Sequence, residues 1–248
     1  MRLLFCLLFC SALLCRPSLA LDAPASLAPL VKVGYYEFPP YTYTDADGRP
    51  RGATLDLLRR LLEKAGYRGE FRGLPGARLY AGLRDGSVHL WPGATGKEAL
   101  RDHVLESRSV LGEFDLALYR RPGMPPAKLP EDLAGRGVIL ISGYTYWKPY
   151  SDWLQDPALK VHIHRTSSHG AALEMLQRHR GDFLLDYHTP VEQARRQLDM
   201  PPMPHQILQR LTAKLIISNK APNAAALRDA LDRAYEQLQA DGVDLRLD

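Results

Sequence analysis

The sequence predicts an α/β fold, because short apolar segments with strand character alternate along the chain with amphipathic segments of helical periodicity. The clearest helix covers residues 55–65, where leucines share one broad face and Gly66 follows at the end. The clearest strand covers residues 137–141, whose unbroken apolar run is typical of a strand buried on both faces of a sheet.

The part of the chain up to residue 91 alternates strands and helices. Strands are predicted over residues 30–36, 67–74 and 88–91, and helices over residues 55–65 and 77–84. Residues 38–41 contain two prolines and must leave the first strand as a loop, since proline cannot donate a ladder hydrogen bond. Residues 45–48 and 85–86 are rich in Asp and Gly, which indicates turns between the elements.

A strand over residues 114–119 leads into residues 120–126, a stretch rich in Pro and Gly that we interpret as a boundary region. The alternation restarts beyond it. Strands are predicted over residues 137–141, 161–164, 183–186 and 211–218, and helices over residues 170–179 and 223–240. The strand over residues 183–186 ends in a carboxylate, Asp186.

The first twenty residues predict a signal peptide that is cleaved after Ala20. A positive charge at Arg2 precedes an apolar run over residues 3–14, and small residues precede the cleavage site. The run is about half the length needed to span a bilayer, so a permanent anchor is not expected. All three cysteines lie in this segment, so the mature chain contains no disulfide, and a periplasmic protein is predicted.

Charge and motifs exclude several function classes. Removing Arg2 and Arg16 with the signal peptide changes 32 basic residues against 28 acidic ones to 30 against 28, which leaves no footprint for nucleic acid or an anionic membrane. Nucleophile elbows, phosphate-binding glycine loops and dinucleotide-binding glycine patterns are missing from the sequence, so no cofactor is expected. His162 and His164 would share one strand face without a third ligand, so no metal site is expected.

Four segments in order resemble the family 3 extracellular solute-binding proteins, the polar amino-acid receptors of ABC importers. They are residues 34–57, with the runs GYYEFPPY, DG and GATLDL; residues 78–89, an Arg-containing helix whose ending has His89 where Asp is usual; residues 181–186; and the final helix with residues 241–242. The resemblance covers nearly the whole mature chain and rests on the order and spacing of motifs that are individually short.

The resemblance implies a two-lobe periplasmic-binding-protein fold, type II-like, with a hinge between the lobes and a ligand cleft. Lobe 1 is expected over residues 26–116, lobe 2 over residues 117–209, and a return to lobe 1 over residues 210–248. The chain is expected to cross between the lobes near residues 116–121 and 208–214. The implied protein is a monomer that captures a small polar solute, an amino acid or a related compound, for an inner-membrane ABC permease, and it is not an enzyme.

The same resemblance implies the ligand-binding residues. Phe38 corresponds to an aromatic residue that lies against the ligand, and Asp186 to an aspartate that pairs with the ligand's ammonium group. Thr145 follows Gly143 at an expected helix start, where amide groups hold an anion or the threonine simply caps the helix. Thr95 is expected to help hold the ligand's carboxylate.

One departure affects the carboxylate site of the resembling family. An Arg normally follows a Ser or Thr after four residues, but here Leu100 occupies that position and Arg101 comes one residue later. One residue turns a helical side chain by about 100°, so Arg101 is expected to leave the cleft unless an insertion at Gly96 restores it. Lys97 is the alternative cation for the ligand's carboxylate, as a point charge in place of the arginine. We therefore predict that ordinary α-amino acids are not bound in the family's usual mode.

Two other function classes remain open. A periplasmic sensor module would use the same cleft to signal to a membrane protein. A dehydratase resembling the periplasmic cyclohexadienyl dehydratases would need a carboxylic acid to protonate a leaving hydroxyl group. Glu113, Glu174 and Asp186 are candidates for that acid, and nothing in their spacing selects one.

Overall fold

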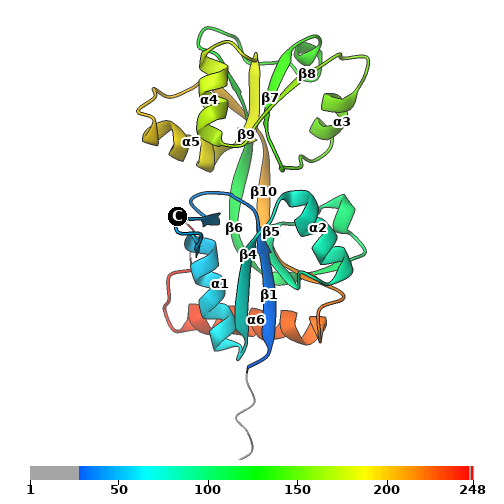
Figure 1. Cartoon of the computed structure of the whole chain (residues 1–248), viewed down its shortest axis with the longest axis vertical. Coiled ribbons are helices and arrows are strands. Elements are labelled where there is room, and N and C mark those ends of the chain that lie inside the picture. Colours follow the sequence, from blue (N-terminus) through cyan, green and yellow to red (C-terminus); the bar gives the residue numbers. More distant parts are fainter. Residues whose placement is uncertain (1–27, 246, 248) are drawn as a thin grey trace, which may run out of the picture.

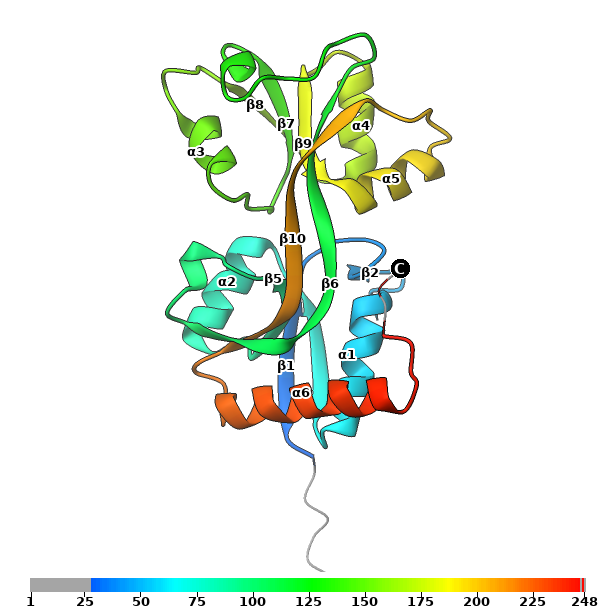
Figure 2. The same ribbon diagram turned by 180° about the vertical axis from the view of Figure 1, so that it is seen from behind.

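Two α/β lobes, joined by two long strands, make up the computed structural model, which describes residues 28–245 and residue 247 (Figures 1 and 2). The predicted signal peptide, residues 1–20, lies outside this described part of the chain. Within the described part, no helix is both long and apolar enough to cross a membrane. The mixed strand and helix order confirms the α/β prediction.

The lower lobe in Figure 1, called lobe 1, contains both ends of the described chain. Its elements are β1 (Leu30–Tyr35), the hairpin strands β2 (Tyr43–Thr44) and β3 (Pro50–Arg51), α1 (Ala53–Lys64), β4 (Arg68–Gly73), α2 (Gly76–Asp85), β5 (Leu90–Ala94), the 3₁₀ helix η1 (Glu98–Leu100) and α6 (Ala224–Ala240). Strand β1 pairs in parallel with β4 and with β5. This local β-α-β order follows from the helical and strand periodicities in the sequence.

The upper lobe in Figure 1, called lobe 2, repeats the parallel arrangement. Its elements are the 3₁₀ helix η2 (Glu131–Leu133), β7 (Gly137–Ile141), α3 (Tyr150–Gln155), β8 (His162–Thr166), α4 (His169–Gln177), β9 (Phe183–Tyr187) and α5 (His188–Gln197). Strand β7 pairs in parallel with β8 on one side and with β9 on the other. The carboxyl ends of β7 and β9 therefore face lobe 1, and the residues that follow them lie at the interlobe surface.

The lobes are connected by β6 (Val104–Arg120) and β10 (His205–Ser218), which pair antiparallel along almost their whole length (Figure 2). These connecting strands join one sheet with the order β4-β1-β5-β10-β6-β9-β7-β8. In lobe 1, β10 pairs with β5 over residues 213–217, and in lobe 2, β6 pairs with β9 over residues 116–120. Between these two regions the connecting strands pair only with each other among the described strands, and a register shift follows Ala213.

Each lobe has apolar cores on both faces of its part of the sheet. In lobe 1, α1 and α6 pack on one face through residues such as Leu61 and Leu231, while α2 packs on the other through Leu79. In lobe 2, the α4 side is built around Leu173, and the opposite side around Leu140. Apolar burial of this extent explains how the described part holds together without a disulfide.

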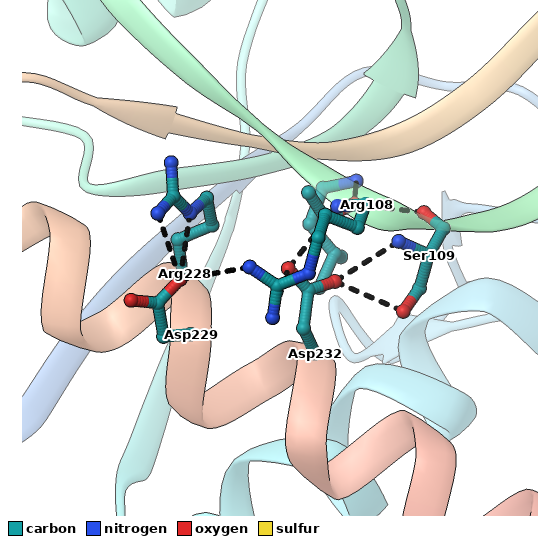
Figure 3. Close-up of polar contacts among 7 residues, drawn as sticks. Arg108, Ser109, Arg228, Asp229 and Asp232 are labelled. Atoms are coloured by element: carbon teal, nitrogen blue, oxygen red, sulfur yellow. Dashed lines mark hydrogen bonds and ion pairs between the residues drawn. The ribbon is translucent and has the colours of Figure 1, made fainter.

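A buried carboxylate fixes the last helix onto a connecting strand (Figure 3). Asp232 of α6 is fully buried and accepts hydrogen bonds from the backbone amides of Arg108 and Ser109 at 3.1 and 3.0 Å, and from the Ser109 hydroxyl at 2.9 Å. Arg108 also reaches the more exposed Asp229, one turn earlier on the helix. The first half of β6 is thereby held against lobe 1.

Three local expectations were wrong. The connecting strands begin well before the predicted residues 114–119 and 211–218. Their first halves form strands only because β6 and β10 pair with each other. No helix begins at Thr145, which lies in irregular structure after a turn at residues 142–143, and α3 starts at Tyr150 instead. The expected crossing regions near residues 116–121 and 208–214 overlap the connecting strands but start late on β6, since β6 already pairs with lobe 2 from Leu116.

Candidate functional site

Aromatic side chains from both lobes meet at the interlobe surface. Phe38, in the loop after β1, is buried, and its ring centroid lies 5.1 Å from that of Tyr187 at the end of β9. The Phe114 ring from connecting strand β6 lies 5.2 Å away, and the Tyr41 ring of lobe 1 stacks at 5.8 Å. Phe38 therefore sits where the two lobes and the hinge region converge.

A pocket opens between lobe 1 and the connecting strands beside Phe38. Its walls include Tyr36, Phe38, Tyr41, Thr42, Thr54, Trp91, Gly93, Phe114 and Ala213. The Tyr36 ring lies 5.7 Å from Trp91 of β5 and 5.4 Å from Tyr144 of lobe 2, so the aromatic surface continues across the interface. Burial holds the pKa of the Tyr36 phenol well above its ordinary value, so this wall is uncharged at neutral pH.

Asp186 is fully buried next to this surface, and its carboxylate already has partners. His169, at the start of α4, places Nδ1 2.7 Å from Oδ2 of Asp186. The backbone amide of Tyr187 donates to Oδ1 at 2.8 Å. The carboxylate that the sequence suggested for a ligand's ammonium group is therefore paired within lobe 2.

The Asp186–His169 pair extends into a hydrogen-bonded chain that reaches lobe 1. Nε2 of His169 lies 3.2 Å from the Tyr144 hydroxyl, which donates to the backbone carbonyl oxygen of Glu37 at 2.5 Å. Because a carbonyl oxygen only accepts, Tyr144 uses its single proton there, and Nε2 of His169 must donate to the Tyr144 oxygen. The 2.7 Å contact between Nδ1 and Asp186 requires a second proton between these two atoms. The pair therefore has no net charge, whether that proton belongs to the histidine or to the aspartate.

Lys97, in the loop after β5, makes a second connection between the lobes. Its Nζ donates to the carbonyl oxygen of Thr145 at 3.0 Å and to the Thr145 hydroxyl oxygen at 2.9 Å, and it lies 2.9 Å from the centroid of the Trp147 ring. The Tyr80 hydroxyl of α2 lies 3.1 Å from the same threonine hydroxyl. Burial lowers the pKa of Lys97 to about 6, because the contact removes water from its amino group.

Arg101 is not brought to the interlobe surface. Its side chain is exposed, it lines a depression together with Lys97 and other residues of lobe 1 and the connecting strands, and it has no hydrogen-bond or ion-pair partner among the described residues. Leu100 is 1% exposed and packs into the α2 core beside Trp91. The extra residue near Gly96 therefore does not return Arg101 to the cleft. Thr95 is half-buried at the hinge, where its amide donates to Thr212 of β10.

The geometry of the described residues indicates no metal site. The described residues contain no group of three or more His, Asp or Glu side chains arranged to hold a metal ion. His162 and His164 of β8 are both exposed. The site is an aromatic surface divided between the two lobes, with hydrogen bonds between the lobes at Tyr144 and at Lys97 and Tyr80.

The family model for the bacterial extracellular solute-binding proteins, family 3, matches residues 31–245 of the sequence. The chain belongs to this family. The matched region includes both lobes and both connecting strands, so every residue of the site described above lies within it.

Solved structures with the same fold include both sensors and transport receptors. A histidine kinase sensor domain with similarity to periplasmic binding proteins is 20% identical, with a TM-score of 0.69 over 86% of this chain and 91% of that one. An ancestral arginine-binding protein bound to arginine is 22% identical, with a TM-score of 0.69 over 87% and 95%. The substrate-binding protein of an amino acid ABC transporter is 17% identical, with a TM-score of 0.64 over 86% and 94%.

At these identities the likeness establishes the fold alone. No curated protein sequence matches the chain closely enough to count as a relative. The structure of this family 3 protein brings Phe38, Thr145 and Asp186 to the interlobe surface, but it adds two residues that sequence reasoning missed, namely His169 and Tyr144. A histidine at a helix start gives no local sign that it pairs with a carboxylate 17 residues later.

Proposed function

We propose that this protein is a periplasmic receptor that captures a small polar solute between its lobes and presents it to an inner-membrane ABC permease. One observation carries the proposal: the aromatic surface around Phe38 is divided between two lobes that are joined by β6 and β10. A solute that contacts both halves favours the closed arrangement over the open one, and the two strands supply the hinge.

The proposal includes export and binding without catalysis. The first twenty residues have the features of a cleaved signal peptide, and family 3 proteins are extracellular, which supports a periplasmic location. Phe38, Thr95, Thr145 and Asp186 belong to the proposed binding surface, Thr95 through the hinge and Asp186 through its contact with His169. N-terminal sequencing of the secreted protein should start at Leu21, and an intact Met1 would contradict export.

The binding experiment uses the three tryptophans of the chain, two of which lie at the candidate site. The mature protein is titrated with amino acids, polyamines and organic acids while tryptophan fluorescence and melting temperature are recorded. A solute that binds only the folded protein raises the melting temperature by mass action. Binding should also reduce the radius of gyration in small-angle X-ray scattering. If no solute of these classes produces either change, the receptor proposal fails.

A second candidate function is a ligand sensor for a membrane signalling protein. It is favoured by the structural likeness to a histidine kinase sensor domain. The two candidates share the cleft and differ in the partner. Deleting the gene should abolish solute uptake if the protein serves a permease, and should leave uptake intact while removing a solute-dependent response if it serves a sensor.

A further inference from the structure

The charges that face the interlobe surface restrict the solute that could bind there. Asp186 is neutralised by His169, and the Glu37 carboxylate accepts from the amide and hydroxyl groups of Thr44 within lobe 1. Lys97 is the one buried basic side chain at this surface, among the described residues, that has no acidic hydrogen-bond or ion-pair partner. The surface therefore offers one buried amino group with uncharged partners, while its buried acid, Asp186, is already paired with His169.

The amino group of Lys97 is placed where a solute can bind it once the lobes open. Its amino group is bound by two oxygens of Thr145 and covered by Trp147, all of which belong to the opposite lobe. Opening of the lobes would separate these contacts, since Lys97 moves with lobe 1 and Thr145 with lobe 2. An anionic group that enters the open cleft can then bind the same nitrogen.

The charged groups around Lys97 do not supply a competing anion. Glu98 pairs with Lys148 of lobe 2 at 3.4 Å, and both side chains are exposed. Glu106 accepts from the amide of Gly96, on the exposed side of the same loop. Arg101 lines the same depression as Lys97, Glu98 and Glu106 and adds a positive charge there, and Tyr80 reaches Lys97 only through the threonine hydroxyl.

The rest of the cleft suits an apolar body. Tyr36, Phe38, Phe114 and Tyr187 present aromatic rings from lobe 1, the hinge and lobe 2. Of the two carboxylates beside these rings, Asp186 is held by His169, and Glu113, which lines the same pocket, lies 3.9 Å from Arg210. An ammonium group placed among the rings would therefore find each carboxylate already paired, and an unpaired buried charge is costly. A carboxylate close to Lys97 has the opposite effect, since it stabilises the charged amino group.

Resting on the proposed function, we propose that the solute is an organic carboxylate with an aromatic or similarly apolar body and no amino group, and that Lys97 is its anchoring residue. The bound carboxylate converts Lys97 from the uncharged amine of the closed, empty cleft to an ammonium group. Binding at neutral pH is therefore accompanied by uptake of up to one proton from the buffer. The carboxylate oxygens replace Thr145 as partners of Nζ.

Three probes of matched shape test the proposal: 3-phenylpropanoate, phenylalanine, which adds an amino group, and 2-phenylethylamine, which lacks the carboxylate. Calorimetry at pH 7.5 in two buffers of different ionisation enthalpy gives both the affinity and the number of protons taken up. We expect 3-phenylpropanoate to bind at least tenfold more tightly than phenylalanine, with proton uptake, and 2-phenylethylamine not to bind.

Two substitutions separate anchoring from structure. Lys97→Met should weaken 3-phenylpropanoate at least tenfold and abolish proton uptake. Lys97→Arg should retain measurable binding without proton uptake, because a guanidinium group is charged at every pH used. Tighter binding of phenylalanine, or binding of 3-phenylpropanoate that Lys97→Met leaves unchanged, overturns the proposal but not the receptor function. If none of these probes and no solute of the wider panel binds, both fail.

Discussion

His169 and Asp186 form a buried pair at the end of β9, with 2.7 Å between Nδ1 of the histidine and Oδ2 of the aspartate. The aspartate is 0% exposed and the histidine 7%. The imidazole of His169 thus occupies one oxygen of the carboxylate, and the protein itself supplies this partner. This contact connects the fold of lobe 2 to the interlobe surface, since Tyr144 continues it to lobe 1.

Asp186→Asn should therefore lower the stability of the protein. Asparagine keeps the shape and can accept one hydrogen bond, but it removes the charge-assisted bond to His169. Hydrogen bonds to charged groups contribute about 1.5–3 kcal/mol, and the free energy of unfolding should fall by that amount. Urea unfolding measures the change. Asp47→Asn, at an exposed turn, is the matched control and should leave the midpoint unchanged. An unaltered midpoint for Asp186→Asn would show that the pair contributes nothing.

The parts of the fold that could be predicted from the sequence are those that depend on neighbouring residues, and the parts that could not depend on contacts between residues far apart in the chain. The helix at residues 53–64 and the strand at residues 137–141 were predictable because their periodicity is local. The first half of β6 contains Glu106, Arg108 and other polar residues, and it is a strand because β10 pairs with it. There Ser107 is buried, and its hydroxyl group accepts from Leu215 of β10, a contact between residues 108 positions apart.

The same distinction between local and long-range interactions applies to the candidate site. The displacement of Arg101 could be predicted, since one extra residue rotates a side chain and Leu100 is the residue that suits the core. The partner of Asp186 could not, because pairing with His169 depends on how α4 packs beside β9. The contact of Lys97 with Trp147 depends on how the two lobes meet, which no local pattern reports.

Arg101→Ala should have almost no effect on solute binding. The arginine is exposed and without a hydrogen-bond or ion-pair partner among the described residues, and surface changes of this kind usually alter free energies by less than about 0.5 kcal/mol. Calorimetry with the best solute of the binding panel measures this. Lys97→Met, four residues earlier, is the comparison and should weaken a carboxylate strongly. A tenfold loss in Arg101→Ala would place the arginine in the cleft.

Stability should rise with pH between about 7 and 9 because of Lys97. Its pKa is lowered to about 6 in the folded protein, below the ordinary value of 10.5. Between these values the unfolded chain binds a proton at Lys97 that the folded chain does not, so unfolding takes up a proton and a higher pH opposes it. The unfolding equilibrium constant should fall by at most about tenfold per pH unit from this group. The difference between wild type and Lys97→Met across that pH range isolates the effect, and parallel curves would contradict it.

Asp232→Ala should destabilise lobe 1 without changing the solute that binds. The substitution removes the charged acceptor of the Arg108 and Ser109 amides (Figure 3), and a hydrogen bond to a charged group contributes about 1.5–3 kcal/mol. We expect the free energy of unfolding to fall by about 3 kcal/mol in chemical denaturation. Asp229→Ala, one turn earlier on α6 with an exposed carboxylate, should have a much smaller effect. Equal effects of the two substitutions would argue against the buried contact.

Tyr144→Phe should shift the empty protein toward an open arrangement of its lobes. The Tyr144 hydroxyl is the donor that reaches Glu37 in lobe 1, and a hydrogen bond of this kind contributes about 1 kcal/mol, or roughly a fivefold change in the ratio of closed to open molecules. Small-angle X-ray scattering should therefore show a larger radius of gyration than wild type, and a bound solute should reverse the difference. Tyr146→Phe is the control, because the Tyr146 hydroxyl contacts only Ile141 and Leu185 of its own lobe among the described residues. If both substitutions give the wild-type radius, the Tyr144 contact does not set the interlobe equilibrium, which leaves the contacts of Lys97, Tyr80 and Glu98 with lobe 2 to set it.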